Sequence, residues 1–124
     1  MKVHGTIEFD VVQLDAEQAI SEMPITAGIK NPAGGSHAGA ILWFADVTAT
    51  VLVFGKQEIV PGMSGFPLAI SLNANLASNQ SSGVLRARST FVKRGKTITV
   101  VRTTVTGEGD KLIADVTTSH VLSK

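Results

Sequence analysis

The chain has 124 residues, a length that fits one domain with a single hydrophobic core. Eleven basic and ten acidic side chains give a formal net charge of +1, which argues against electrostatic binding to nucleic acid or to an anionic membrane. The absence of cysteine excludes disulfides, thiolate metal sites and a cysteine nucleophile. The three histidines, at positions 4, 37 and 120, are too widely spaced to suggest a histidine metal site.

No repeat, low-complexity tract or linker interrupts the sequence, so we expect a single domain over residues 1–124. The N-terminus lacks the apolar stretch of a secretion signal, which favours a cytoplasmic protein. The segment closest to membrane length, residues 38–54, carries Asp46 near its middle, where a carboxylate costs about 2.5–3.5 kcal/mol in a bilayer. A buried helix is the better interpretation of this segment.

The first two expected elements are strands, at residues 8–14 and 18–25, joined by a hairpin turn at residues 15–17. Pro24 in the second strand indicates an edge position or an irregularity, because proline has no N–H to donate to a neighbouring strand. Residues 31–36 are rich in Asn, Pro, Gly and Ser, which predicts a loop.

The next segment favours a long buried helix over residues 37–54, with Ser36 as its N-cap and Gly55 at its C-terminal end. Its β-branched valines weaken helix propensity, but a strand of this length is rarer than a buried helix of about five turns. Because the helix is apolar on nearly all sides, we expect something to cover it on every side.

Four further strands are expected at residues 68–76, 84–93, 97–106 and 112–122, separated by turn-rich segments. Two strands, one apolar helix and four strands indicate an α+β fold. In the arrangement that we predict, a curled antiparallel β-sheet wraps around a long central α-helix.

The entry to the helix, residues 34–39, is rich in glycine. Backbone N–H groups at this point have no partner within the helix and lie at the positive end of its dipole. The segment can therefore stabilise an oxyanion or polarise a carbonyl group. The alternative is a tight turn that serves only to begin the helix.

Asp46 is the only charged residue in the helix, and Thr50 follows one turn later on the same face. Burying a carboxylate alone is costly, so this residue is paired, partly solvated or functional. A general base or nucleophile is the functional interpretation. The structural alternative is a salt bridge to Arg86, Arg88 or Arg102.

His37 and Asp46 are nine positions apart, which corresponds to roughly 13 Å along a helix. The entrance of one helix therefore cannot reach the same substrate atom as Asp46 of that chain. If both act on one bond, they come from different subunits, as in a two-fold dimer with antiparallel helices. We therefore predict a homodimer with two sites at its interface.

Other candidates carry weaker signals. We expect His37 to orient the loop by hydrogen bonding, His120 to be structural or exposed, and Trp43 to lie in the core or at an interface. A basic cluster either binds phosphates or forms a solvated strand face; it comprises Arg86, Arg88, Lys93, Arg94 and Lys96.

The segment from Asn31 to Gly39, followed by Leu42 and Asp46, resembles the Asn-x-x-Gly-x-x-His-Gly-Gly…Leu-x-x-Asp signature of hotdog-fold acyl-CoA thioesterases. The phenylacetate-degradation (PaaI-like) subfamily is the most similar group. The resemblance extends over most of the chain, including a later Gly83-Val84-Leu85-x-Ala87…Gly95-Lys96 stretch. It implies a hotdog fold and hydrolysis of an acyl-CoA thioester to a free acid and coenzyme A.

The resemblance also implies roles for single residues. Asp46 would be the nucleophile or general base, and the Ala38 N–H of the partner subunit would polarise the carbonyl. Asn31 would position water or substrate, and Thr50 would assist near the acid. Basic residues would meet the phosphates of coenzyme A: Arg88, Lys93, Arg94 and Lys96. Ala38 replaces the second glycine of the signature, and its methyl group can narrow the pocket.

No cofactor beyond the coenzyme A of the substrate is implied, and such homodimers often pair again into tetramers. The leading alternative is a hotdog module that binds acyl-CoA without hydrolysing it. A hydratase on the same fold is a third interpretation, which the arrangement of His37 and Asp46 disfavours.

Overall fold

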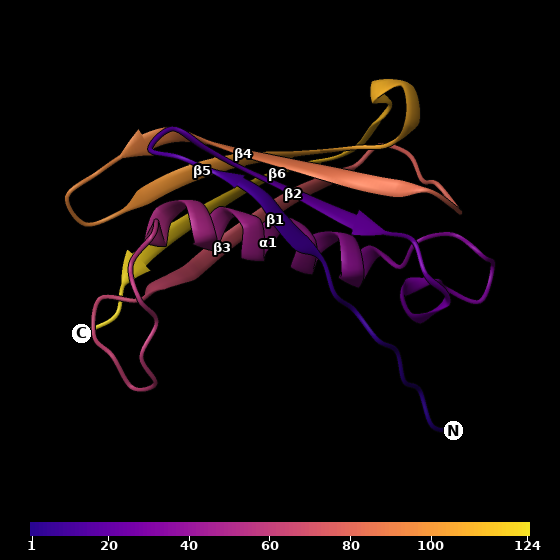
Figure 1. Ribbon diagram of the computed structural model, residues 1–124, viewed down its shortest axis with the longest axis horizontal. Coiled ribbons are helices and arrows are strands. Elements are labelled where there is room, and N and C mark those ends of the chain that lie inside the picture. Colours follow the sequence, from indigo (N-terminus) through magenta and orange to yellow (C-terminus); the bar gives the residue numbers. More distant parts are fainter.

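The computed structural model describes residues 1–124 and consists of one α-helix and a six-stranded antiparallel sheet (Figure 1). The elements in chain order are β1 (Asp10–Leu14), β2 (Gln18–Pro24), η1 (Ala27–Ile29), α1 (Ala38–Phe54), β3 (Pro67–Leu76), β4 (Val84–Arg94), β5 (Thr99–Thr106), η2 (Glu108–Asp110) and β6 (Leu112–Leu122). The only α-helix falls short of the length and apolarity that a bilayer span requires.

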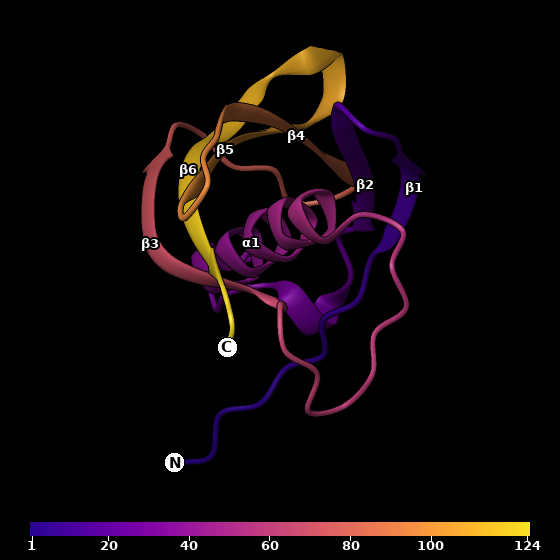
Figure 2. The ribbon, with the colours of Figure 1, turned by 90° about the vertical axis from the view of Figure 1, so that its left-hand side faces the viewer.

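The strands follow the order β1-β2-β4-β5-β6-β3, and every neighbouring pair is antiparallel. β3 comes directly after α1 in the chain but lies at the far edge of the sheet, beside β6. The end-on view in Figure 2 shows the sheet curled around α1. The expected α+β architecture, a curled sheet around a central helix, is therefore confirmed.

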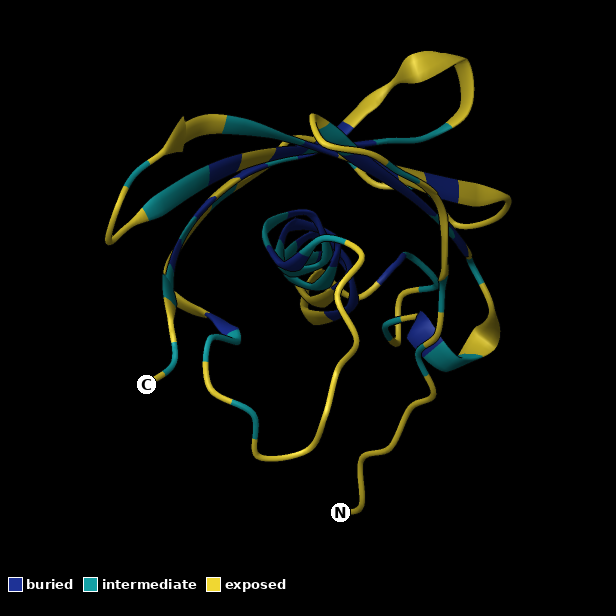
Figure 3. Ribbon diagram, turned by 60° about the vertical axis from the view of Figure 1, so that its left-hand side comes forward, coloured by how far each residue is buried: buried dark blue, intermediate teal, exposed yellow.

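The core lies between α1 and the concave face of the sheet (Figure 3). Phe44 of α1 is fully buried and belongs to the same cluster as Met23, Leu85 and Val116 from three strands. Buried and exposed residues alternate along β4, β5 and β6, as expected for strands with one face on the core. This alternation fixes which side chains of each strand point toward α1.

Within one protomer the sheet covers α1 on one side only, so the cover that we expect on the other side stays a prediction. Residues at helical spacing remain partly or fully exposed: Gly39, Trp43, Asp46, Val47 and Thr50. Figure 3 shows the loop over residues 55–66, rather than a second layer, passing on this side. A single sheet can bury one face of a helix and leaves the opposite face open.

Two local expectations need correction. The N-cap of α1 is His37, whose Nδ1 accepts the N–H of Gly39; Ser36 is buried and donates its hydroxyl to the carbonyl oxygen of Gln80. β2 is not an edge strand, because it pairs with both β1 and β4. Pro24 is tolerated since it is the last residue of β2, beyond the pairs that β2 makes with β1.

Candidate active site

Asp46 lies in the middle of α1 and is partly buried. Together with Thr50, one turn later, it lines a cavity of about 420 Å³ between α1, the loop that follows it and the start of β3. The remaining lining residues are apolar: Val47, Val51, Phe54, Ile59, Phe66, Pro67, Leu68 and Ala69. The site therefore places one carboxylate and one hydroxyl in an otherwise apolar cavity.

The carboxylate of Asp46 forms no ion pair and no side-chain hydrogen bond, and its Oδ1 is buried without a partner. The one ion pair of the structure joins Arg102 to Asp115 at 2.9 Å, and Arg102 holds the pKa of that carboxyl below its usual value. Arg88 donates instead to Gln18. The structural alternative, a salt bridge between Asp46 and a strand arginine, is therefore wrong.

The N-terminus of α1 has one free amide. The N–H of Gly39 donates to His37 Nδ1 at 2.8 Å. The Ala40 and Ile41 amides donate to the carbonyl oxygen of His37 at 3.0 and 3.2 Å. The N–H of Ala38 is exposed and has no acceptor, so it remains available to an oxyanion or a carbonyl oxygen.

The loop before α1 is held by two asparagines. Asn31 Oδ1 accepts the N–H groups of Ala33 and Gly35 at 3.0 and 3.1 Å. Asn79, from the connection between β3 and β4, accepts the N–H of Ser36 at 2.9 Å and donates to its carbonyl oxygen at 3.0 Å. Sequence reasoning missed Asn79, because a contact over 43 positions leaves no local pattern.

A second cavity, of about 770 Å³, lies at this entrance, and its lining includes Asn31, His37 and Trp43 together with residues 3–7. It shares no lining residue with the cavity beside Asp46. The structure thus brings Asn31 and His37 together, and Asp46 and Thr50 together, but separates the two pairs along α1. Within one protomer the predicted site is present as two halves.

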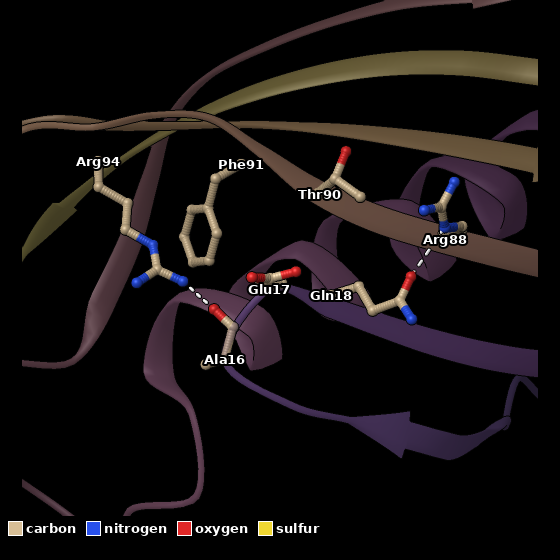
Figure 4. Close-up of a pocket in the computed structure, with 7 residues that line it drawn as sticks. All are labelled: Ala16, Glu17, Gln18, Arg88, Thr90, Phe91 and Arg94. Carbon is tan, nitrogen blue, oxygen red and sulfur yellow. Dashed lines mark hydrogen bonds between the residues drawn. The ribbon is translucent and has the colours of Figure 1, made fainter.

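The basic candidates gather around the β4–β5 hairpin but do not form one patch. Arg88 and Arg94 line a shallow cavity on β4 (Figure 4). Arg88 donates to Gln18 Oε1 at 2.9 Å. Arg94 donates to the carbonyl oxygen of Ala16, and its guanidinium lies 3.8 Å from the ring centre of Phe91. Both guanidinium groups are therefore partly engaged within the protomer.

Lys93 and Lys96 lie exposed at the adjoining turn, where they line a separate hollow with Arg94. Neither lysine forms an ion pair. Arg94 also borders a hollow beside Val53, near the C-terminal end of α1. Val53 is roughly 10 Å along the helix axis from Asp46. Of the residues that line the hollow with the two lysines, Arg94 is therefore the one that also borders the C-terminal end of α1.

The burial of His120 differs from one of the two positions expected from the sequence. It is 1% exposed, so the expectation that it could be exposed is wrong. Its Nε2 lies 2.8 Å from Thr118 Oγ1, and its Nδ1 is buried without a partner. Burial lowers the pKa of His120, and the negative charge of Asp46 opposes that shift. The alternation that buries residues 114, 116 and 118 was the signal for this placement.

No group of three or more histidine, cysteine, aspartate or glutamate side chains is arranged to hold a metal ion. No protein-family model matches the chain. The chain is 26% identical over 113 residues to a 1,4-dihydroxy-2-naphthoyl-CoA hydrolase of Listeria monocytogenes, an alignment that covers 91% of this chain and 89% of the relative.

Solved structures agree with the architecture. A thioesterase enzyme from Staphylococcus aureus superposes with a TM-score of 0.85 at 19% identity, covering 95% of both chains. A hypothetical thioesterase protein from Streptococcus pneumoniae, crystallised with coenzyme A, superposes with a TM-score of 0.81 at 13% identity, covering 94% of this chain and 86% of that one.

The chain has the fold of these solved thioesterases and is similar in sequence to a CoA-ester hydrolase. The superpositions confirm the hotdog fold, and these similar proteins confirm the expectation of a thioesterase-type enzyme. The roles of single residues and the PaaI-like subfamily stay predictions.

Proposed function

We propose that this chain hydrolyses acyl-CoA thioesters at two equivalent sites, each built by both protomers of a homodimer. Asp46 of one protomer attacks the thioester carbonyl or activates water, and the Ala38 N–H of its partner polarises that carbonyl. The observation that carries the proposal is the Asp46 carboxylate, which lies in an apolar cavity without an ion-pair or hydrogen-bond partner. The similarity to a hydrolase of a CoA thioester supports it.

Two chemical routes use the same groups. As a nucleophile, a carboxylate oxygen bonds to the carbonyl carbon, the C–S bond breaks, and coenzyme A leaves as a thiolate that takes up a proton; water then hydrolyses the mixed anhydride. As a base, Asp46 accepts a proton from water, the hydroxide bonds to the same carbon, the C–S bond breaks, and the leaving coenzyme A thiolate takes up the proton held by Asp46. Negative charge develops on the carbonyl oxygen in both routes, where the Ala38 N–H stabilises it.

The remaining residues complete the two halves. The Thr50 hydroxyl lines the Asp46 cavity and is assigned to assist the acid. The side-chain N–H₂ of Asn31 forms no hydrogen bond within the protomer and is assigned to orient water or substrate in the entrance cavity. His37 acts indirectly, because its Nδ1 is already bonded to the N–H of Gly39 and fixes the turn that presents Ala38.

The homodimer is supported by the separation of the two halves and by the free edge of β3. The backbone of β3 is paired on one side only. Leu72 and Leu76 lie opposite the buried Thr118 and Ala114 of β6 and share their face, yet are 41% and 49% exposed. Two-fold pairing of β3 edges would join the sheets, cover these leucines and set the two helices antiparallel. A further pairing of dimers gives the tetramer.

The substrate parts are assigned by chemistry. The apolar cavity beside Asp46 takes the acyl group. The phosphates of coenzyme A are assigned to the basic residues of the β4–β5 hairpin, among which the two lysines have no acidic partner: Arg88, Lys93, Arg94 and Lys96. Because of the nine-residue spacing between His37 and Asp46, we place the chain in the PaaI-like subfamily.

The test is Asp46→Asn against a panel of short-chain, aromatic and long-chain acyl-CoAs, with thiol release as the measurement. We expect the wild type to turn over at least one class, and the variant to lose about 10²–10⁴-fold in kcat while still binding the substrate. Asp115→Asn is the matched control, since it removes one carboxylate from the convex side of the sheet. A wild type that binds acyl-CoA without turnover would contradict the proposal and favour the non-catalytic module.

A further inference from the structure

Two buried polar atoms in the structure lack hydrogen-bond partners, Asp46 Oδ1 and His120 Nδ1. His120 lies on β6 opposite Ala69 of β3 and Thr99 of β5. Opposite residues of antiparallel strands project to the same face, and this face carries the core. Ala69 lines the same cavity as Asp46. His120 therefore lies at the wall of the sheet that borders the carboxylate.

Asp46 is the only charged group that faces His120 from the elements packed against β6. It is the single charged residue of α1, and β3 contains none. The one charge of β5, Arg102, projects from the opposite face of the sheet and is paired with Asp115. The effect of Asp46 on the pKa of His120 agrees with this isolation, since no other charge acts on the ring.

The bond to Thr118 decides which ring nitrogen carries the proton. If Nε2–H donated to Thr118 Oγ1, a lone pair of Nδ1 would lie in the field of a carboxylate, which is repulsive. If the Thr118 hydroxyl donates to Nε2, the neutral ring carries its proton on Nδ1 and offers an N–H to the carboxylate. The presence of Asp46 therefore favours the Nδ1–H tautomer.

We infer that His120 is a positioning residue for Asp46: its neutral Nδ1–H holds the buried Oδ1 through one water molecule, while the other oxygen faces the cavity, and Thr118 fixes the tautomer. A donor to the charged form of a carboxylate stabilises that form and limits its rotation. A nucleophile or general base needs both properties. The inference rests on the proposed function, because that proposal makes Asp46 the reacting group.

The kinetic test separates the two ring nitrogens. In His120→Asn the amide reaches the position of Nδ1, whereas in His120→Gln it reaches that of Nε2. We expect His120→Gln to lower kcat by about 10- to 100-fold with KM within about twofold, and to move the acidic limb of the kcat/KM profile to higher pH. We expect His120→Asn to lose less activity than His120→Gln. We expect Thr118→Val to move the acidic limb of the kcat/KM profile to higher pH as well, by a smaller amount.

Thr103→Val is the matched control. Thr103 is a buried threonine on the same face of the sheet, and its hydroxyl is bonded to Ser89 at 2.6 Å. Its replacement lowers the free energy of unfolding without moving the pH profile. If His120→Gln and His120→Asn lose activity only in proportion to stability, with unchanged pH profiles, His120 has a structural role and the inference is overturned.

A measurement without substrate keeps the inference apart from the proposed function. ¹⁵N NMR of the His120 ring is expected to show the Nδ1–H tautomer in the wild type, and Asp46→Asn is expected to lower the pKa of His120. An Nε2–H tautomer, or a titration that Asp46→Asn leaves unchanged, overturns the inference whatever the thioesterase assay gives. The expected NMR result in a wild type without turnover supports the Asp46–His120 contact and overturns only the proposed function.

Discussion

The N–H of Ala38 and the carboxylate of Asp46 are complementary groups, a donor and an acceptor, and neither has a partner within the protomer. Proteins pair nearly all of their buried polar groups, so an unpartnered carboxylate oxygen in a core helix needs a reason. A substrate carbonyl can accept from the first group while the second group supplies the attack on its carbon. The Ala38 N–H and the Asp46 oxygen that faces the cavity therefore match the two ends of one reacting bond, whereas the buried Oδ1 is the oxygen that we assign to His120.

Ala38→Pro tests the role of the Ala38 N–H, because proline has no backbone N–H to donate. Ala38 is the first residue of α1, where proline is tolerated, and the dihedral angles of His37, φ −67° and ψ 133°, suit a residue before proline. We expect kcat to fall by about 10²–10³-fold, as when an oxyanion-hole donor is removed, with helix content retained by circular dichroism. Ala38→Gly keeps the N–H and should lose far less; an equal loss in both variants would contradict the role of the amide.

At the scale of elements, the entrance of α1 depends on a connection far away in the chain. Asn79, between β3 and β4, forms two hydrogen bonds with the backbone of Ser36 and also accepts the N–H of Gln80. Gly35 approaches this side chain so closely that an added Cβ would lie 3.2 Å from its nitrogen. The loop that presents His37 and Ala38 is thus held against this connection by the side-chain amide of Asn79, together with the Ser36 hydroxyl, which donates to Gln80.

Asn79→Ala removes these bonds. At about 0.5–1.5 kcal/mol for each of the three hydrogen bonds, we expect the free energy of unfolding to fall by roughly 1.5–4.5 kcal/mol, as measured by urea denaturation. We also expect a lower kcat, because the Ala38 amide loses its fixed position. Ser81→Ala is the control, since Ser81 is exposed in the same connection and its side chain forms no hydrogen bond. Unchanged activity in Asn79→Ala would contradict this prediction, because it would show that the loop keeps the Ala38 amide in position without Asn79.

Local patterns in the sequence were enough for most elements. The alternation over residues 112–122 and the glycine after Phe54 gave the bounds of β6 and the end of α1 as the structure has them. The expected start of β5 at Thr97 came too early, because Gly95 and Ile98 close the preceding turn. Local patterns failed where a distant partner decides: Ser36 caps no helix because Gln80 takes its hydroxyl.

For the site, Asp46 could be predicted from the sequence because it is the one carboxylate in an apolar helix. That Asp46 forms no ion pair with Arg102 could not be predicted, because Arg102 of β5 pairs with Asp115 of β6 instead. The engagement of Arg94 with Ala16 likewise depends on where the β1–β2 hairpin folds. Pairings between strands are tertiary facts, which periodicity within one strand does not contain.

At the scale of the whole molecule, one protomer presents two half-sites in two separate cavities. In the two-fold arrangement that we propose, each complete site takes Asp46 from one protomer and Ala38 from the other. The consequence is that a protomer in which one of these two residues is changed can still contribute the other, unchanged residue to a site that it shares with its partner.

Mixing two inactive variants tests this directly. In a heterodimer of Asp46→Asn and Ala38→Pro protomers, one site carries both changes and the other carries neither. When the two variants pair at random in equal amounts, half of the dimers are heterodimers, and each heterodimer has one intact site out of two. We therefore expect about a quarter of the wild-type activity after co-expression or joint refolding. Each variant alone stays inactive in the same assay. Failure of the mixture to recover activity would contradict the shared site.

The residues that line the cavity beside Asp46 include residues of α1 and residues of the connection that follows it. Val51 and Phe54 belong to α1, whereas Ile59 and Phe66 belong to the connection between α1 and β3. The ring of Phe66, at the end of this connection, lies 5.5 Å from that of Phe54. The helix is tied to the sheet by the core, but the length and composition of such a connection can vary without disturbing it. If this cavity takes the acyl group, as we propose, changes in the connection alone would alter acyl preference and leave Asp46 and the helix in place.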